Sequence, residues 1–300
     1  MENYQAVFKR KEIKYLLSRE ERNALLPILE VHMEPDAFAH SSISNLYYDT
    51  PDFRMVRRSL EKPMYKEKLR LRSYGTPENI STVFPEIKKK AMGIVYKRRI
   101  SLPYQEAVSF LSGQQIASAD TCDGTTRQIP STDIFDGTTR QIFHELDWML
   151  ASYEDLAPRV FLSYERDSYK GISDPSLRLT LDQDILFRTD RLDLREGASG
   201  EAILLPDQTL MEVKISNAAP LWLAQALSEI GIFPVSFSKY GRAYERICRD
   251  PRRHQEMNEH AEIDVRAKID GHAEINVHTK INEHAKINGH AKEMEMKRYA

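Results

Sequence analysis

The stretch YKEKLRLRSY, Tyr65–Tyr74, decides the fold class of this chain, because its positive charges fall on every second residue. Side chains of a β-strand alternate between two faces with a period of two. If the stretch is a strand, one of its faces carries Lys66, Lys68, Arg70 and Arg72. An apolar core cannot hold this face, because burying unpaired charge costs several kcal/mol. The charged face therefore meets either water or a cavity that binds an anion.

Three further stretches repeat this alternation and add carboxylates to the charged face. They are FKRKEIKY (residues 8–15), FPEIKKK (84–90) and TLMEVKI (209–215). As strands, they align Arg10, Glu12 and Lys14, then Glu86, Lys88 and Lys90, and finally Glu212 and Lys214. A single charged stripe is usually the solvated face of a sheet. Four stripes with interspersed acids favour a charged cavity instead.

The remaining pattern predicts an α+β fold with an antiparallel sheet or barrel at its centre. Strand-like segments rich in β-branched and aromatic residues lie at 6–15, 42–48, 65–73, 83–90, 94–102, 159–167, 177–182 and 209–215. Helical patterns cover 18–31, 51–60, 104–111, 140–153, 220–230 and 238–249. Ser18 and Glu21 form a capping-box signature, and Pro51 is expected at the first helical position. Eight strands are enough to close a barrel.

Composition restricts the partners that the protein is expected to bind and the cellular compartment in which it is expected. The net charge is only −2, so positive charge is local to the strands, and basic runs without interleaved aromatics argue against nucleic acid. Cys122 and Cys248 stand in no metal or redox spacing, as expected in a reducing cytoplasm. No signal peptide or stretch of about 20 apolar residues is present, which predicts a soluble cytoplasmic protein.

Two repeats lie outside the charged strands. The heptapeptide DGTTRQI occurs at 123–129 and 136–142, within a polar stretch that we interpret as a tolerant surface loop. From His260 a six-residue period runs through HAEIDV, RAKIDG and HAEINV towards the C-terminus. We expect a domain over residues 1–249 and a poorly ordered tail over 250–300; metal storage by the tail histidines is a minor alternative.

The charged strands suit one kind of ligand. Arginines two residues apart present two planar donor forks on one face, and such pairs on neighbouring strands fit a linear chain of phosphates. The carboxylates of Glu12, Glu86 and Glu212 could hold a divalent metal ion among these cations.

These motifs also carry a family resemblance. RKEIKYLL, SISNLYYDTPDF, KEKLRLRSYG, EIKKK with VYKRRISL, YERDSY, RLTLDQDI, LMEVKI and SFSKYGRAY follow one another in the order of a VTC domain. This domain is the catalytic part of the vacuolar transporter chaperone polyphosphate polymerase, in the triphosphate tunnel metalloenzyme (CYTH-like) superfamily. The chain resembles the short prokaryotic form over about residues 4–247.

The resemblance implies an eight-stranded antiparallel tunnel with surrounding helices that binds ATP and polyphosphate and uses Mn²⁺ or Mg²⁺. The implied activity is polyphosphate polymerase, an ATP:polyphosphate phosphotransferase. Two alternatives stay open: a tunnel triphosphatase that hydrolyses inorganic or organic triphosphate, and a module that binds polyphosphate without turnover. The first strand reads Arg10-x-Glu12-x-Lys14 and has one carboxylate fewer than hydrolytic members, which favours the polymerase. A membrane partner protein and the oligomeric state also stay open.

Residue roles follow from the same resemblance. The implied catalytic residues are Lys14, Arg70, Arg72, Lys88, Arg166 and Lys239. Further phosphate contacts are implied for Lys97, Arg99, Arg178, Lys214 and Arg242, with Arg98 an alternative in the strand whose register is uncertain by one residue. The metal ligands are implied to be Glu212, Glu86 and Glu12.

Overall fold

The structure is a computed structural model, and it describes residues 11–250 except 93, 114–136, 154 and 217. The chain divides into two compact units, Met1–Ile247 and Cys248–Ala300, and almost all described residues belong to the first. Arg10, Cys122, the first DGTTRQI copy and the histidine-rich repeats lie outside the described residues. No helix in the described part is long and apolar enough to cross a bilayer.

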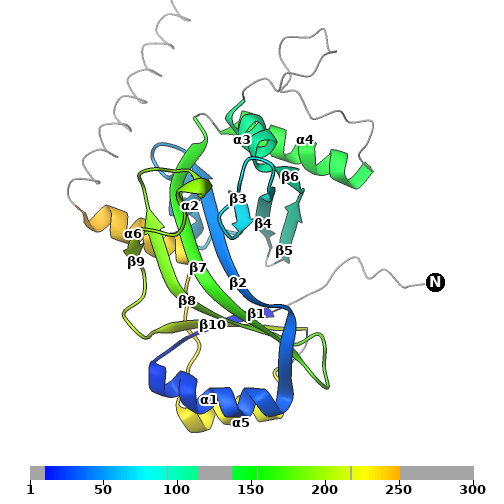
Figure 1. The fold of residues 1–300 in the computed structure, drawn as a ribbon, viewed down its shortest axis with the longest axis vertical. Helices are drawn as coiled ribbons and strands as arrows, with labels where there is room; N and C mark the ends of the chain where they lie inside the picture. Colours follow the sequence, from blue (N-terminus) through cyan, green and yellow to red (C-terminus); the bar gives the residue numbers. More distant parts are fainter. Residues whose placement is uncertain (1–10, 93, 114–136, 154, 217, 251–300) are drawn as a thin grey trace, which may run out of the picture. The chain divides into compact units, whose positions relative to one another are not determined.

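An antiparallel sheet organises the first unit (Figure 1). Its strands follow the spatial order β1-β10-β8-β7-β2-β3-β4-β5, and two short strands, β6 and β9, pair with β4 and β8. The strands are β1 (Lys11–Leu17), β2 (Met33–Asp49), β3 (Tyr65–Tyr74), β4 (Thr82–Ala91), β5 (Ile94–Arg99), β6 (Leu102–Pro103), β7 (Ala157–Gly171), β8 (Arg178–Arg188), β9 (Glu201–Ala202) and β10 (Thr209–Ile215). The α+β class and an eight-strand antiparallel path are thereby confirmed.

The expected closure of the sheet into a barrel is not made by hydrogen bonds. Among the described residues, β1 and β5 are the two edges of an open sheet. One ion pair spans this opening, between Lys88 Nζ on β4 and Glu12 Oε2 on β1 at 3.8 Å. Both edge strands are short, with seven described residues in β1 and six in β5. Few backbone N–H and C=O groups are therefore available to pair β1 with β5.

The helices are α1 (Arg19–His32), α2 (Arg54–Leu60), α3 (Tyr104–Ser112), α4 (Gly137–Ser152), α5 (Leu221–Ile230) and α6 (Lys239–Arg249). Two groups of them pack against the outer face of the sheet, whereas the first turn of α6 contacts the charged face. One apolar core joins α3 and α4 to β3 and β4 through Phe110, Phe143 and Leu69. A second core joins the adjacent helices α1 and α5 to β1, β8 and β10, through residues such as Leu25, Leu223 and Met211 (Figure 1). Because both cores lie outside the sheet, its other face is left to the charged side chains.

Several expected boundaries change. The capping box of α1 is confirmed, since Ser18 Oγ accepts from the Glu21 amide at 3.2 Å and the Glu21 carboxylate accepts from the Ser18 amide at 2.7 Å. The expectation of Pro51 at the first helical position is wrong, because α2 begins at Arg54 after Phe53 adopts a left-handed conformation (φ 55°). The second DGTTRQI copy is not a loop: from Gly137 on it forms the first turns of α4, and Ile142 is buried.

The central strands β2 and β7 are much longer than expected. The first half of β2, Met33–Ser42, is mostly exposed and carries neither apolar alternation nor a charged stripe, so its sequence gave no strand signal. It is a strand because it pairs with β7, in a register broken by a bulge between Pro35 and His40.

Candidate active site

Glu86 on β4 is the centre of a first group of charges on the concave face. Its side chain is buried, and its Oε2 accepts from Arg70 Nε at 2.8 Å and from Arg70 Nη2 at 2.5 Å. Lys97 Nζ lies 2.9 Å from Oε1, and Arg72 and Arg99 lie 3.9 Å from the carboxylate. Burial would raise the pKa of Glu86, but Arg70, Arg72 and Lys97 lower it to about 2. Glu86 is therefore ionised and holds these cations in place.

Strand register explains why these residues meet. Arg70 on β3 lies opposite Glu86 on β4, which lies opposite Arg99 on β5. Arg98 points to the other face, where its Nη1 lies 3.3 Å from Glu145 of α4, so Lys97 and Arg99 are the basic residues of β5 on the Glu86 side. We call the concave side chains of β3, β4 and β5 the cationic wall. Its members are Lys66, Lys68, Arg70, Arg72, Glu86, Lys88, Lys90, Lys97 and Arg99.

A second group of charges surrounds Glu212 on β10 and Asp182 on β8. Glu212 Oε1 accepts from Lys14 Nζ and from Lys239 Nζ, each at 3.0 Å. Arg166 donates from Nε and Nη2 to the two oxygens of Asp182 at 2.6 and 2.7 Å, and Lys239 also bonds Asp182. We call this group the mixed wall. Its members are Glu12, Lys14, Arg166, Asp182, Glu212, Lys214 and Lys239.

The charges of the mixed wall stabilise one another. Burial opposes ionisation of Glu212, but Lys239, Lys14 and Arg166 hold its pKa well below the ordinary value. Lys239 is buried as well, yet Glu212 and Asp182 raise its pKa above the ordinary value. Burial and Glu212 would raise the pKa of Glu12, but Lys88 and Lys14 keep it lowered. All these groups are therefore charged near neutral pH.

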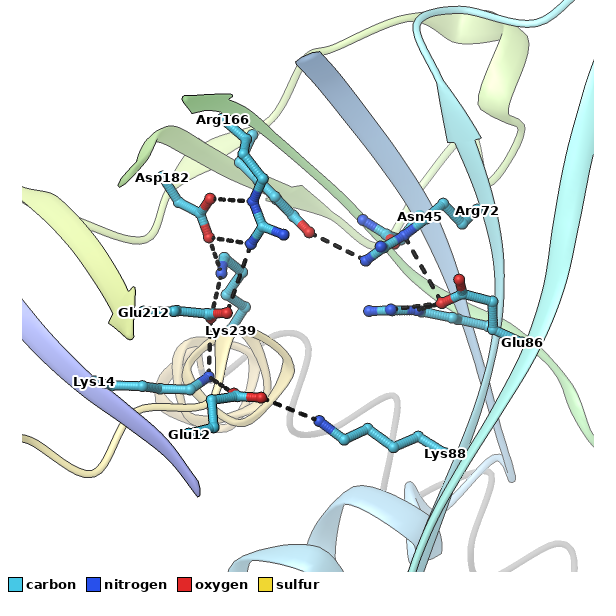
Figure 2. Close-up of polar contacts among 12 residues, drawn as sticks. Glu12, Lys14, Asn45, Arg72, Glu86, Lys88, Arg166, Asp182, Glu212 and Lys239 are labelled. Carbon is cyan, nitrogen blue, oxygen red and sulfur yellow. Dashed lines mark hydrogen bonds and ion pairs between the residues drawn. The ribbon is translucent and has the colours of Figure 1, made fainter. Parts of the chain in front are cut away.

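Side chains of the two walls point toward one another across the concave face (Figure 2). Lys88 of the cationic wall pairs directly with Glu12 of the mixed wall. Arg72 donates to Asn45 Oδ1 at 3.0 Å and to the Tyr164 hydroxyl at 3.1 Å. Asn45 belongs to β2, which lies between the walls in the sheet order, and Tyr164 belongs to β7, which also carries Arg166 of the mixed wall.

Lysines of the cationic wall face one another without a carboxylate between them. Lys66 lies opposite Lys90, and Lys68 lies opposite Lys88. Within the described residues, no ion pair neutralises Lys66, Lys68 or Lys90; Lys68 Nζ instead donates to Ser238 Oγ at 3.2 Å. Burial, with Lys88 and Lys66 nearby, lowers the pKa of Lys68 to about 8. Like charges directly opposite destabilise a sheet, so an anion bound here would relieve this repulsion.

The remaining residues of the implied site are more dispersed. Arg178 Nη1 bonds Asp36 of the β2 bulge at 2.5 Å, away from the two carboxylate centres. Lys214 on β10 lies opposite Glu12 on β1, and burial lowers the pKa of Lys214. Arg242 pairs with Glu245 along the exposed side of α6 at 2.9 Å and contacts neither wall. Glu86 does not join Glu12 and Glu212, because it belongs to the other wall.

Sequence reasoning missed several polar residues of this face. Asp182, fully buried, binds two cations, and Tyr47 accepts from Arg70 Nη1 at 3.1 Å. A signal for Asp182 was present, because it follows Arg178 at an even spacing in RLTLDQDI and so shares its face. Asn45 and Tyr164 carried no such signal, since only the neighbouring strand supplies their partner Arg72.

Two of the three implied metal ligands fit a metal ion. Glu12 Oε1 and Glu212 Oε1 lie 3.4 and 3.0 Å from the same Lys14 Nζ, so both carboxylates converge on one point. Within the described ranges no group of three or more His, Cys, Asp or Glu could hold a metal by itself. Glu12 and Glu212 are therefore the two carboxylates of the described residues that could share one metal ion with a bound substrate.

These features define a class of protein in which an antiparallel sheet carries charged walls on its concave face and apolar cores with helices on its outer face. The model of the VTC domain family matches residues 9–248, and the chain belongs to this family. No curated protein matches the chain.

Solved structures resemble the chain at low sequence identity. A proposed adenylate cyclase from Bacillus halodurans has a TM-score of 0.44 at 16% identity, covering 77% of this chain and 94% of its own. One from Vibrio parahaemolyticus has a TM-score of 0.39 at 14% identity, covering 80% and 99%. A proposed adenylyl cyclase from Hippeastrum, described as having a dominant triphosphatase activity, has a TM-score of 0.42 at 16% identity, covering 76% and 92%. These scores are low, so membership rests on the family match.

Proposed function

We propose that the protein is a metal-dependent polyphosphate polymerase that transfers the γ-phosphate of ATP to a growing polyphosphate chain. The observation that carries the proposal is the excess of positive charge on the cationic wall. From Lys66 to Arg72 this wall extends over seven residues of β3, about 20 Å at the rise of a strand. A cationic surface of this length exceeds what a single triphosphate needs and suits a chain of phosphates.

The proposed reaction needs positioning more than covalent help. A terminal oxygen of polyphosphate attacks the γ-phosphorus of ATP, a new P–O bond forms, and the bond to the β-phosphate breaks so that ADP leaves. The acceptor oxygen is already anionic near neutral pH, so no general base has to remove a proton. Arg70, Arg72 and Arg166 present planar N–H forks suited to phosphoryl oxygens.

The mixed wall would serve the end of the site where charge builds up on the leaving group. Lys239 and Lys14 flank Glu212 and can each donate to phosphate oxygens. Mn²⁺ or Mg²⁺ held by Glu212 and Glu12 would neutralise charge on the phosphates. The ammonium groups now paired with these carboxylates would give way to the metal ion and would pair with the substrate phosphates instead.

The test is to incubate the purified protein with ATP and Mn²⁺ or Mg²⁺ and to separate the products by length on a gel stained for polyphosphate. We expect ADP together with a ladder of long chains. Free phosphate without chains would identify a triphosphatase, and unchanged ATP with retained polyphosphate binding would identify a binding module. Either of these outcomes overturns the polymerase.

A further inference from the structure

The N-terminal turn of α6 contacts three different parts of the sheet. Ser238, just before the helix, accepts a hydrogen bond from Lys68 of the cationic wall. Lys239 bonds Asp182 and Glu212 of the mixed wall. The Tyr240 hydroxyl donates to Asp49 Oδ2, at the end of β2, at 2.8 Å. Three consecutive residues therefore join both walls to the central strand.

Asp49 anchors this turn. Its carboxylate is fully buried and accepts five hydrogen bonds: from the amides of Thr50 at 2.9 Å, Met55 at 2.8 Å and Val56 at 3.0 Å, from the Thr50 hydroxyl at 3.4 Å, and from Tyr240. The Met55 and Val56 amides belong to the first turn of α2, whose own N-cap residue makes no side-chain hydrogen bond. The carboxylate of Asp49 satisfies these amides instead, and so locks α2, β2 and Tyr240 together.

Tyr240 also reaches the cationic wall through its ring. The ring stacks on Tyr47 with centroids 4.4 Å apart, and the Tyr47 hydroxyl accepts from Arg70 Nη1. Tyr240 is 2% exposed, so the stack has little room to move. Displacement of Tyr240 would shift both Arg70, through Tyr47, and the neighbouring Lys239.

We propose that Asp49 and Tyr240 are positioning residues that set the place of Lys239 between Asp182 and Glu212. Neither of the two touches the phosphates; they act through Lys239 and, by way of Tyr47, through Arg70. The inference rests on the proposed phosphoryl transfer at this site. The inference assigns a positioning role to the buried hydrogen bond between Tyr240 and Asp49, which joins α6 to the end of β2.

A matched control separates positioning from simple stability. Tyr153 donates its hydroxyl to the buried carboxylate of Glu67 at 2.6 Å. Glu67 alternates with Lys66 and Lys68 on β3 and so lies on the outer face, away from both walls. Tyr153→Phe and Tyr240→Phe therefore remove the same kind of phenol–carboxylate hydrogen bond, and each leaves the carboxylate with other donors.

The experiment measures four quantities for the full chain and both variants. They are the thermal unfolding midpoint, the affinity for inorganic tripolyphosphate by calorimetry, and kcat and KM for ATP consumption. We expect both variants to lower the unfolding midpoint, whereas only Tyr240→Phe lowers kcat, by about tenfold to a hundredfold, as expected for a misplaced catalytic group. Adding Tyr240→Phe to Lys239→Gln is expected to lower kcat by less than Tyr240→Phe does in the wild type, because the part of the effect that runs through Lys239 is already lost and only the route through Tyr47 and Arg70 remains.

Each result has a definite meaning. Equal kcat values for Tyr240→Phe and Tyr153→Phe in an active protein would overturn the positioning role alone. Additive losses in the double variant would overturn it as well. A wild-type protein that neither binds tripolyphosphate nor consumes ATP would reject the proposed function together with this inference. If Lys239→Gln does not fold, the comparison of the two tyrosine variants decides.

Discussion

The two walls of the concave face are built from the same residue types but in different proportions. On the cationic wall one carboxylate, Glu86, pairs with four neighbouring cations, and three further lysines have no acidic partner in the part of the chain that the structure describes. On the mixed wall three carboxylates alternate with the ammonium and guanidinium groups that bridge them. One wall carries unsatisfied positive charge, and the other is close to neutral.

This difference separates two tasks. Unneutralised lysines repel one another, and this repulsion is relieved when a polyanion binds. The paired charges of the mixed wall are held in a defined geometry, because each carboxylate has several charge-assisted hydrogen bonds. We therefore assign chain binding to the cationic wall and the metal and the leaving group to the mixed wall.

The largest effect is expected when the arginines of the cationic wall are removed. Arg70→Ala combined with Arg72→Ala should lower turnover at least about a hundredfold, since removing one donor to a developing anion already costs about that much. ATP consumption measures the loss, and far-UV circular dichroism checks the fold, because Glu86 keeps Lys97 as a partner. Normal rates in this double variant would remove the cationic wall from the site.

Paired substitutions of the two central carboxylates sharpen the comparison. Glu212→Gln should remove most activity and the dependence on Mn²⁺ or Mg²⁺, because it takes away a proposed metal ligand. Glu86→Gln should raise KM but keep the metal response, since Glu86 only positions Arg70 and Lys97. Activity titrated against metal concentration distinguishes them. The assignment of tasks to the walls is wrong if both variants lose the metal response equally.

A smaller effect is expected from pH. Burial and neighbouring lysines lower the pKa of Lys68 to about 8, while Arg70, Lys68 and Arg72 outweigh burial and lower the pKa of Tyr47 to about 8. As pH rises through 8, Lys68 loses its positive charge and Tyr47 gains a negative one, so affinity for polyphosphate should fall. Calorimetry between about pH 7 and pH 9.5 measures the change.

Lys68→Arg is the control for this pH dependence, because a guanidinium stays charged over this range. The fall in affinity should become shallower in the variant while the affinity at pH 7 changes little. Identical profiles for the variant and the wild type would show that Lys68 does not contribute.

The smallest effect is expected from removal of residues 251–300. These residues lie beyond the end of the family match at residue 248, so truncation after Asp250 should leave kcat and KM nearly unchanged. Rates of the truncated and full-length proteins, measured side by side, test this. A large loss would make the histidine-rich repeats part of the functional unit.

The four charged strands could be predicted because each is a local pattern with the period of a strand. The same alternation predicted which face of β3, β4 and β10 carries charge, and all three strands are confirmed. The long first half of β2 could not be predicted, because no local pattern marks it and pairing with β7 alone makes it a strand. Asn45 and Tyr164 could not be predicted as site residues for the same reason, since their role depends on Arg72 from another strand.

The sequence by itself determined that the chain forms an antiparallel sheet with charged stripes, and its ordered motifs indicated the VTC domain family. A period-two pattern encodes the face of each side chain, and this information is local. Only the tertiary structure decided that Glu86 and Glu212 belong to different walls and that Asp182 and Lys239 meet. These groupings depend on sheet register and on the docking of α6, which bring together residues far apart in the chain.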